Sequence, residues 1–120
     1  MRIEVANSEI LDKFSILEIK ESRGLDVSVE KKKLEDSVCA LFESYIIGFY
    51  YEILKTINEQ LWEIEDAKRD RERRKEFGDE FTDLSRSVYM INDERARIKK
   101  MIDLFSESEI NEVKSHRSYL

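Results

Sequence analysis

The chain has 120 residues and a formal net charge of −6, with 41% hydrophobic and 40% charged residues and no proline. This length limits it to a single domain with a modest core, and a proline-free composition rich in charged and aliphatic residues is typical of long helices. The acidic balance excludes a general nucleic-acid binder, which needs a clustered basic surface to neutralise phosphates.

Cysteine usage and hydropathy bear on the compartment. The single cysteine, Cys39, excludes an intrachain disulfide and fits a reducing environment. The first residues lack the apolar stretch of a signal peptide, and the longest apolar run, residues 45–51, is far shorter than a bilayer requires. We therefore expect a cytoplasmic protein without a membrane span.

The first predicted helix covers about residues 8–23. Asn7 or Ser8 can cap its beginning, and Gly24 supplies its end. Apolar residues lie on two nearly opposite faces of this helix, and such a helix normally packs between several partners. We expect it to contact more than one other helix.

The second predicted helix is the longest, at about residues 28–74. Apolar positions keep helical spacing from Leu34 to Ile64, and nothing obliges the helix to stop before Lys75. At 1.5 Å per residue, such a helix would be a rod of about 70 Å. Gly48 is the one candidate break, which would let a monomer fold compactly, but we favour close helix packing as the role of this glycine.

A mixed-charge run, residues 68–76, ends this helix. We interpret it as a solvated helix end, and a contact with phosphate or with an acidic membrane surface is the alternative. Gly78 then ends the helix and Asp79 caps the third helix, predicted over residues 79–105. A short fourth helix is expected at about 107–114.

The third helix carries an apolar seam whose members alternate steps of three and four, as in a heptad repeat. Its members are Phe81, Leu84, Val88, Ile91, Arg95, Ile98, Ile102 and Phe105. Two antiparallel helices do not enclose apolar faces as wide as these. We therefore predict an all-α, coiled-coil-like bundle of long antiparallel hairpins, which a second copy completes as a homodimeric four-helix bundle.

Several polar residues fall on the inner side of these helices when counted at 100° per residue. Asn58 lies at the inner edge of the second helix, and Arg95 lies within the apolar face of the third. A buried arginine needs a partner, for which Glu65 is the best candidate, with Trp62 as a cation–π neighbour. The network either fixes the register of the helices or recognises an anion or a sugar. The candidate ligand-binding residues are Trp62, Glu65, Asn92, Arg95 and Lys99.

Little in the sequence points to catalysis. The only histidine, His116, lies near the end of the chain, and there is no glycine-rich phosphate loop, so we expect no cofactor and identify no catalytic residue. The acidic pairs Glu63-x-x-Asp66 and Glu80-x-x-Asp83 resemble the carboxylate boxes of magnesium-dependent helical nucleoside triphosphate pyrophosphohydrolases. Most of these carboxylates point away from the apolar face, which suits solvent better than a metal.

Two segments carry a more specific pattern. In residues 5–23 it comprises Glu9, Asp12-Lys13, Ile16-Leu17, Ile19-Lys20 and Arg23. In residues 61–100 it comprises Leu61-Trp62, Ile64-Glu65-Asp66, Phe81, Leu84, Arg86, Val88-Tyr89, Asn92-Asp93 and Arg95-Ala96. Both segments resemble an uncharacterised family of short helical proteins of bacteria and phages, often encoded near lipopolysaccharide and glycosyltransferase genes. Ser8 and Ser85 depart from the glycine and alanine of that pattern, and residues 24–60 do not align with it.

The resemblance implies a bacterial or phage source and a link to surface sugars, but no activity. The leading hypothesis is a non-enzymatic helical module that dimerises and binds another protein in surface-polysaccharide metabolism. The rival is a binding or catalytic pocket for a phosphorylated sugar or a nucleotide, built from Glu65, Asn92, Arg95 and Lys99. A third hypothesis is an acidic protein that inhibits a partner.

Overall fold

The computed structural model describes residues 4–106, and all of its regular structure in that range is helical. The helices are α1 (Asn7–Ser22), α2 (Ser28–Leu41), α3 (Tyr45–Arg73) and α4 (Asp79–Phe105). The predicted all-α bundle is therefore confirmed, whereas the coiled-coil geometry and the dimer stay predictions. The short helix expected at about 107–114 lies outside the described residues.

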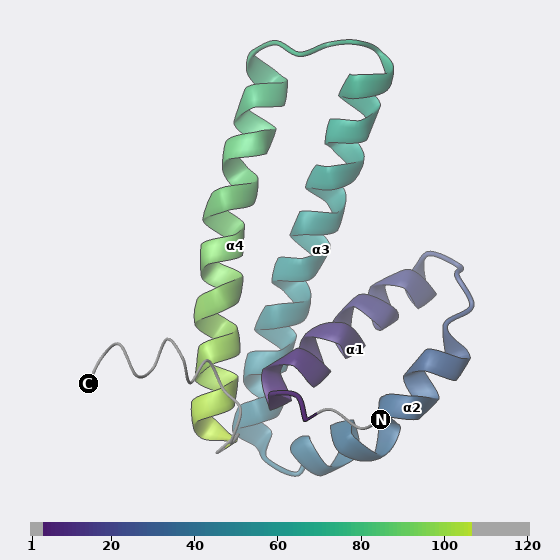
Figure 1. Cartoon of the computed structure of the whole chain (residues 1–120), viewed down its shortest axis with the longest axis vertical. Coiled ribbons are helices and arrows are strands. Elements are labelled where there is room, and N and C mark those ends of the chain that lie inside the picture. The colour runs from purple at the N-terminus through teal and green to yellow at the C-terminus, as the bar shows by residue number, and fades with distance from the viewer. Residues whose placement is uncertain (1–3, 107–120) are drawn as a thin grey trace.

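The long hairpin of α3 and α4 organises the molecule (Figure 1). Its two helices run antiparallel, α1 crosses the lower half of the hairpin, and α2 packs against α1. Because α1 contacts α2, α3 and α4, the prediction of several partners for the first helix is confirmed. The dimensions of 45 × 41 × 31 Å also exclude the expected rod of about 70 Å.

The predicted continuous helix over residues 28–74 is wrong, because the chain turns between α2 and α3. Ser44 is the N-cap of α3, and its side chain accepts a hydrogen bond from the backbone N–H of Ile47 at 3.5 Å. At the same corner, the ring centroid of Phe42 lies 6.4 Å from that of Phe14 and 5.0 Å from that of Tyr51. The turn thus lets α2 pack against α1 while the chain continues into α3. It also places the Phe42 ring against Phe14 of α1 and Tyr51 of α3.

Gly48 is not the break, and close packing does not explain it either. The residue lies in the first turn of α3, and a Cβ atom placed there would meet no other heavy atom within 4 Å. The break is instead marked by the N-cap Ser44, four residues earlier. The helical spacing of apolar residues continues across this position and gives no sign of the break. The structure gives no physical reason for a glycine at this position.

Left-handed residues end two of the helices. Gly24, with φ of 86°, follows α1 as predicted, and its N–H donates to the Glu21 carbonyl at 3.0 Å. At the tip of the hairpin the corresponding residue is Lys75, with φ of 57°, rather than Gly78. Gly78 instead occupies the N-cap position of α4, with φ of −80°, and Asp79 is the first residue of that helix.

The core lies at the base of the hairpin and receives side chains from all four helices. Its buried members are Leu11, Val38, Ile47, Tyr51, Leu54 and Ile102. Burial of each large apolar side chain contributes about 1.5–3 kcal/mol, so this cluster is the main source of stability.

The N-terminus of α1 is capped by a residue of α4. Ala6 occupies the N-cap position and offers no side-chain acceptor. Instead, the Asp103 carboxylate accepts hydrogen bonds from the Ser8 backbone N–H at 2.9 Å and from the Ser8 hydroxyl at 2.8 Å. Because a carboxylate also complements the positive end of a helix, this contact joins α1 to α4 at the base of the bundle.

We expect Asp103→Ala to lower the free energy of unfolding by about 2–4 kcal/mol, because it removes two charge-assisted hydrogen bonds from a fully buried site. Urea denaturation followed by circular dichroism measures the change. The matched control is Asp93→Ala on the exposed side of the same helix. Equal stabilities of the two variants would show that the cap is not important.

Tyr51 makes the stability of the fold depend on pH in the alkaline range. Burial, and next the hydrogen bond that its hydroxyl donates to Glu18, raise the pKa of Tyr51 well above its usual value of 10.0. Above about pH 10 the unfolded chain therefore loses a proton that the folded chain keeps, and stability falls as the pH rises.

We expect Tyr51→Phe to reduce this loss of stability by up to about 1.4 kcal/mol per pH unit. Urea unfolding at a series of pH values above 10 measures the slope. The exposed Tyr89→Phe variant should keep the wild-type slope. An unchanged slope in Tyr51→Phe would contradict the assignment.

Candidate functional site

A buried carboxylate, Asp12 of α1, lies at the centre of the polar residues inside the bundle. Its side chain is only 6% exposed. The Asn58 side-chain amide of α3 donates to Asp12 Oδ1 at 2.9 Å and to Ser15 Oγ at 2.7 Å. The Ser15 hydroxyl in turn donates to the Asp12 backbone carbonyl at 2.7 Å. These contacts fix α1 against α3.

Two basic residues of α4 complete the cluster. Arg95 binds Asp12 with two nitrogens: Nε donates to Oδ1 at 3.1 Å, and Nη2 donates to Oδ2. Lys99 Nζ lies 3.9 Å from Asp12 Oδ2 and forms an ion pair with Glu9. Since a buried carboxylate is tolerated only when it is paired and hydrogen-bonded, the cluster ties α1 to both helices of the hairpin.

The structure brings together only part of the predicted site. Arg95 and Lys99 point inward, but Arg95 is paired with Asp12, so the predicted partner Glu65 is wrong. Glu65 lies 4.0 Å from Lys68. Asn92 is exposed and takes no part in the cluster.

The predicted cation–π contact between Arg95 and Trp62 is also wrong, because a different arginine lies over the ring. The Arg23 guanidinium lies 5.5 Å from the centroid of the Trp62 ring. Arg23 follows the end of α1, so the contact attaches that end to α3. Trp62 and Arg95 nevertheless line the same cavity.

The residues that the sequence analysis missed are Asp12 and Ser15. They follow Ser8 at four and seven residues, which places three polar side chains on one stripe of the first helix. All three are buried. A polar stripe on a helix that is expected to have several partners indicates buried polar contacts. This pattern could have identified Asp12 and Ser15 from the sequence.

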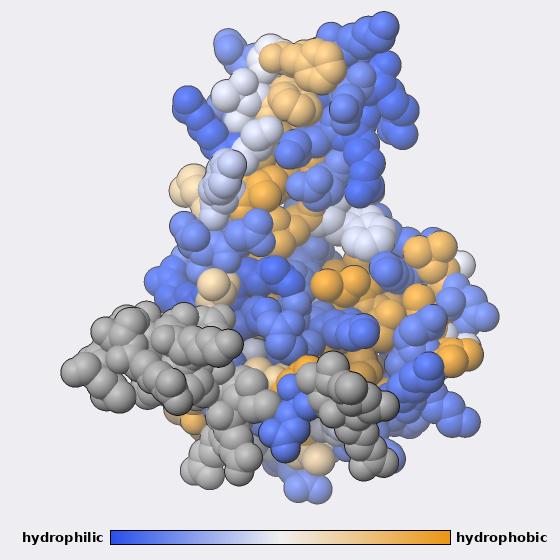
Figure 2. Space-filling view, in the orientation of Figure 1, coloured by the Kyte–Doolittle hydropathy of each residue, from blue (hydrophilic) through white to orange (hydrophobic). Residues whose placement is uncertain are grey.

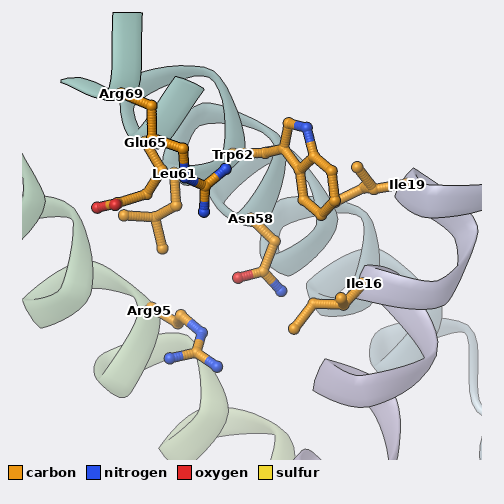
Figure 3. Close-up of a pocket in the computed structure, with 8 residues that line it drawn as sticks. All are labelled: Ile16, Ile19, Asn58, Leu61, Trp62, Glu65, Arg69 and Arg95. Atoms are coloured by element: carbon orange, nitrogen blue, oxygen red, sulfur yellow. The ribbon is translucent and has the colours of Figure 1, made fainter. Parts of the chain in front are cut away.

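A cavity of about 330 Å³ opens beside the Asp12 cluster, between α1 and the hairpin (Figure 3). We call it the α1–α3 cavity. Its lining residues are Ile16, Ile19, Asn58, Leu61, Trp62, Glu65, Arg69 and Arg95. Figure 3 shows apolar side chains of α1 and α3 along its walls, with the polar ends of Asn58 and Arg95 directed between the helices. Three of the five predicted ligand-binding residues thus line one cavity.

The carboxylate pairs do not form a metal-binding cluster. Within residues 4–106, no three acidic, histidine or cysteine side chains gather as metal ligands would. Asp66 is paired with Arg69 at 3.4 Å, and Glu80 is paired with Arg71. In the same part of the chain, none of the helices combines the length and hydrophobicity needed to cross a bilayer.

We expect Arg95→Met to lower the free energy of unfolding by about 2–4 kcal/mol, because it leaves Asp12 buried without its bidentate partner. Arg97→Met on the exposed side of α4 is the matched control and should change stability by less than about 0.5 kcal/mol. Both are measured by urea denaturation.

The double variant Asp12→Asn/Arg95→Met tests whether Asp12 and Arg95 stabilise each other. It should lose less stability than the sum of the two single changes, because neither charge is then left alone. Strict additivity would show that the two residues do not stabilise each other.

Comparison with known proteins places the chain in a family. A family model described as a family of unknown function, DUF6165, matches residues 1–119, and the chain belongs to that family. Searches of curated proteins and of solved structures gave no match. The resemblance seen in two segments is therefore confirmed as membership of an uncharacterised family, whereas the bacterial or phage source and the neighbouring genes stay predictions.

Proposed function

We propose that this member of the DUF6165 family is a non-enzymatic helical module that forms a homodimer through the outer part of its hairpin. We call this part the arm, and define it as residues 61–73 of α3 and 79–91 of α4. The observation that carries the proposal is an apolar seam along the arm that, beyond its first turn beside α1, no other helix of the described residues covers.

Burial stops where the arm begins. The last buried residue of α3 is Asn58, and the first buried residue of α4 is Ile102. Six apolar residues of the arm form the seam and are only partly buried, namely Leu61, Ile64, Phe81, Leu84, Val88 and Ile91. Figure 2 shows hydrophobic residues along the arm between polar edges. Since two helices alone do not enclose such a seam, a further helical surface is expected to cover it.

The charges at the tip favour a second copy as that surface. Residues 66–75, at the end of α3, contain six basic and three acidic side chains, whereas residues 76–83, leading into α4, contain four acidic side chains and no basic one. If a two-fold axis runs along the arm, α3 of one copy faces α4 of the other with the two tips together. The basic end of each α3 then meets an acidic segment of the partner, which favours this pairing.

The shape of the described chain also fits a dimer limited to the arm. At the base, α1 already covers the hairpin through Asp12 and Ser8, so that face is occupied. The homodimeric four-helix bundle expected from the sequence is therefore limited here to the two arms. The resemblance of residues 5–23 and 61–100 supports placing this module, and a protein partner for it, in surface-polysaccharide metabolism of a bacterium or phage.

We expect light scattering coupled to size-exclusion chromatography to give a mass of twice 14.4 kDa at high micromolar concentration. Leu84→Lys should shift the protein to the monomer, because a charge placed on the seam would have to be buried between two arms. The position is partly exposed in one chain, so the lysine ammonium can reach water and the fold is kept.

The matched control is Met90→Lys, since Met90 of α4 is 70% exposed and lies off the seam. This variant should keep the mass of the wild type. A wild-type mass of a single chain at every concentration would overturn the proposal. Dissociation by Met90→Lys alone would show that a different face of α4 forms the interface.

A further inference from the structure

The α1–α3 cavity contains a hydrogen-bond acceptor that the described chain leaves unused. Asn58 is 5% exposed, and its amide N–H groups are both used, on Asp12 and on Ser15. Among residues 4–106 none donates a hydrogen bond to Asn58 Oδ1. Because buried carbonyl oxygens in proteins are almost always hydrogen-bonded, this atom is available to accept a hydrogen bond from a ligand in the cavity.

Two guanidinium groups, those of Arg69 and Arg95, offer N–H donors to the same cavity. Arg95 uses Nε and Nη2 for Asp12, and no residue in the described range binds Nη1, so donors remain for a ligand. Arg69 stands at the rim and makes only a long contact of 3.4 Å with Asp66. A planar guanidinium binds phosphate and carboxylate oxygens with paired N–H groups, so two of them on one cavity favour an anion.

The other polar wall residue, Glu65, accepts hydrogen bonds. Its side chain is 44% exposed, and its carboxylate lies 4.0 Å from the Lys68 ammonium, at the limit of an ion pair. A ligand beside it must therefore offer hydrogen-bond donors as well as an anionic group. Hydroxyl groups meet this requirement for Asn58 Oδ1 and for Glu65 together.

The apolar walls and the volume of the cavity restrict the class of ligand further. Ile16, Ile19, Leu61 and Trp62 form an apolar surface, which suits the C–H face of a sugar ring. A volume of about 330 Å³ is at the lower end for small-molecule sites and suits one sugar ring with its phosphate. A free nucleotide sugar would require a larger space.

We propose that the α1–α3 cavity binds a monosaccharide phosphate. The phosphate lies against Arg69 and Arg95, sugar hydroxyls bind Asn58 Oδ1 and Glu65, and the sugar ring packs on Trp62. The site is formed by one chain at the base of the arm, so it does not depend on the proposed dimer. It keeps three of the predicted ligand-binding residues, Trp62, Glu65 and Arg95, and replaces Asn92 and Lys99 with Asn58 and Arg69.

The chain carries its own reporter for this proposal, because Trp62 is its single tryptophan. We expect Trp62 fluorescence to change saturably on titration with glucose 1-phosphate, with a weaker response to inorganic phosphate and to glucose. Arg69→Gln should raise the Kd for glucose 1-phosphate about five- to tenfold by removing one charge-assisted contact.

Arg73→Gln is the matched control. Arg73 lies one helical turn further along α3, is exposed like Arg69, and likewise pairs with an aspartate three residues earlier. It should leave the Kd unchanged. Folding of both variants is checked by circular dichroism, which should match the wild type because both side chains are exposed.

Three results would overturn the proposal. They are the absence of a saturable fluorescence change at millimolar glucose 1-phosphate, an equal loss of affinity in Arg73→Gln, and binding of inorganic phosphate as tight as that of the sugar phosphate. None of these results changes the mass measured for the wild type or for Leu84→Lys, so failure of the binding site and failure of the dimer are distinguishable.

Discussion

A buried carboxylate needs partners, and this requirement at Asp12 determines how three of the four helices pack. Asn58 of α3 and Arg95 of α4 supply the partners, so α1 is held in one register against both helices of the hairpin. Apolar contacts alone would allow α1 to slide, because they are not directional. A charged group that is stable in only one arrangement removes that freedom. The same contacts set the position of Ile16 and Ile19, and hence the width of the α1–α3 cavity.

The molecule divides into a closed base and an open arm, and the two candidate functions follow this division. At the base, α1 and α2 cover the hairpin, and among the described residues Asp12 and Ser15 are paired inside, while Asn58 Oδ1 and Arg95 Nη1 are left for a ligand. Along the arm, the same hairpin continues without cover and its seam stays partly exposed. A small ligand suits the boundary between the two parts, where α1 ends against Trp62. A second helical surface suits the arm itself.

Helical spacing predicted the first helix and the long antiparallel hairpin that turns before Asp79, but not the corner that separates α2 from α3 and makes the fold compact. The apolar pattern continues through residues 42–44, so only the cap at Ser44 marks the turn, and a serine amid apolar residues is a weak signal. The inward positions of Arg95 and Lys99 were predictable from their own helix. Their partners were not, because α1 is more than 80 residues away in sequence and its register depends on the corner at Ser44. Helical spacing within the hairpin alone therefore points to Glu65, and not to Asp12, as the partner of Arg95.

The cap that Asp103 provides for α1 has a consequence for the order of folding. Helices α3 and α4 are joined by residues 74–78 alone, so their pairing closes only a short loop and can form early. The N-terminus of α1 meets its cap across 95 residues of sequence, after α4 is complete. Helix α1 can therefore take its final register on the hairpin only once α4 has formed. The α1–α3 cavity exists only while α1 is docked on the hairpin, so a molecule bound there also stabilises the docked position of α1.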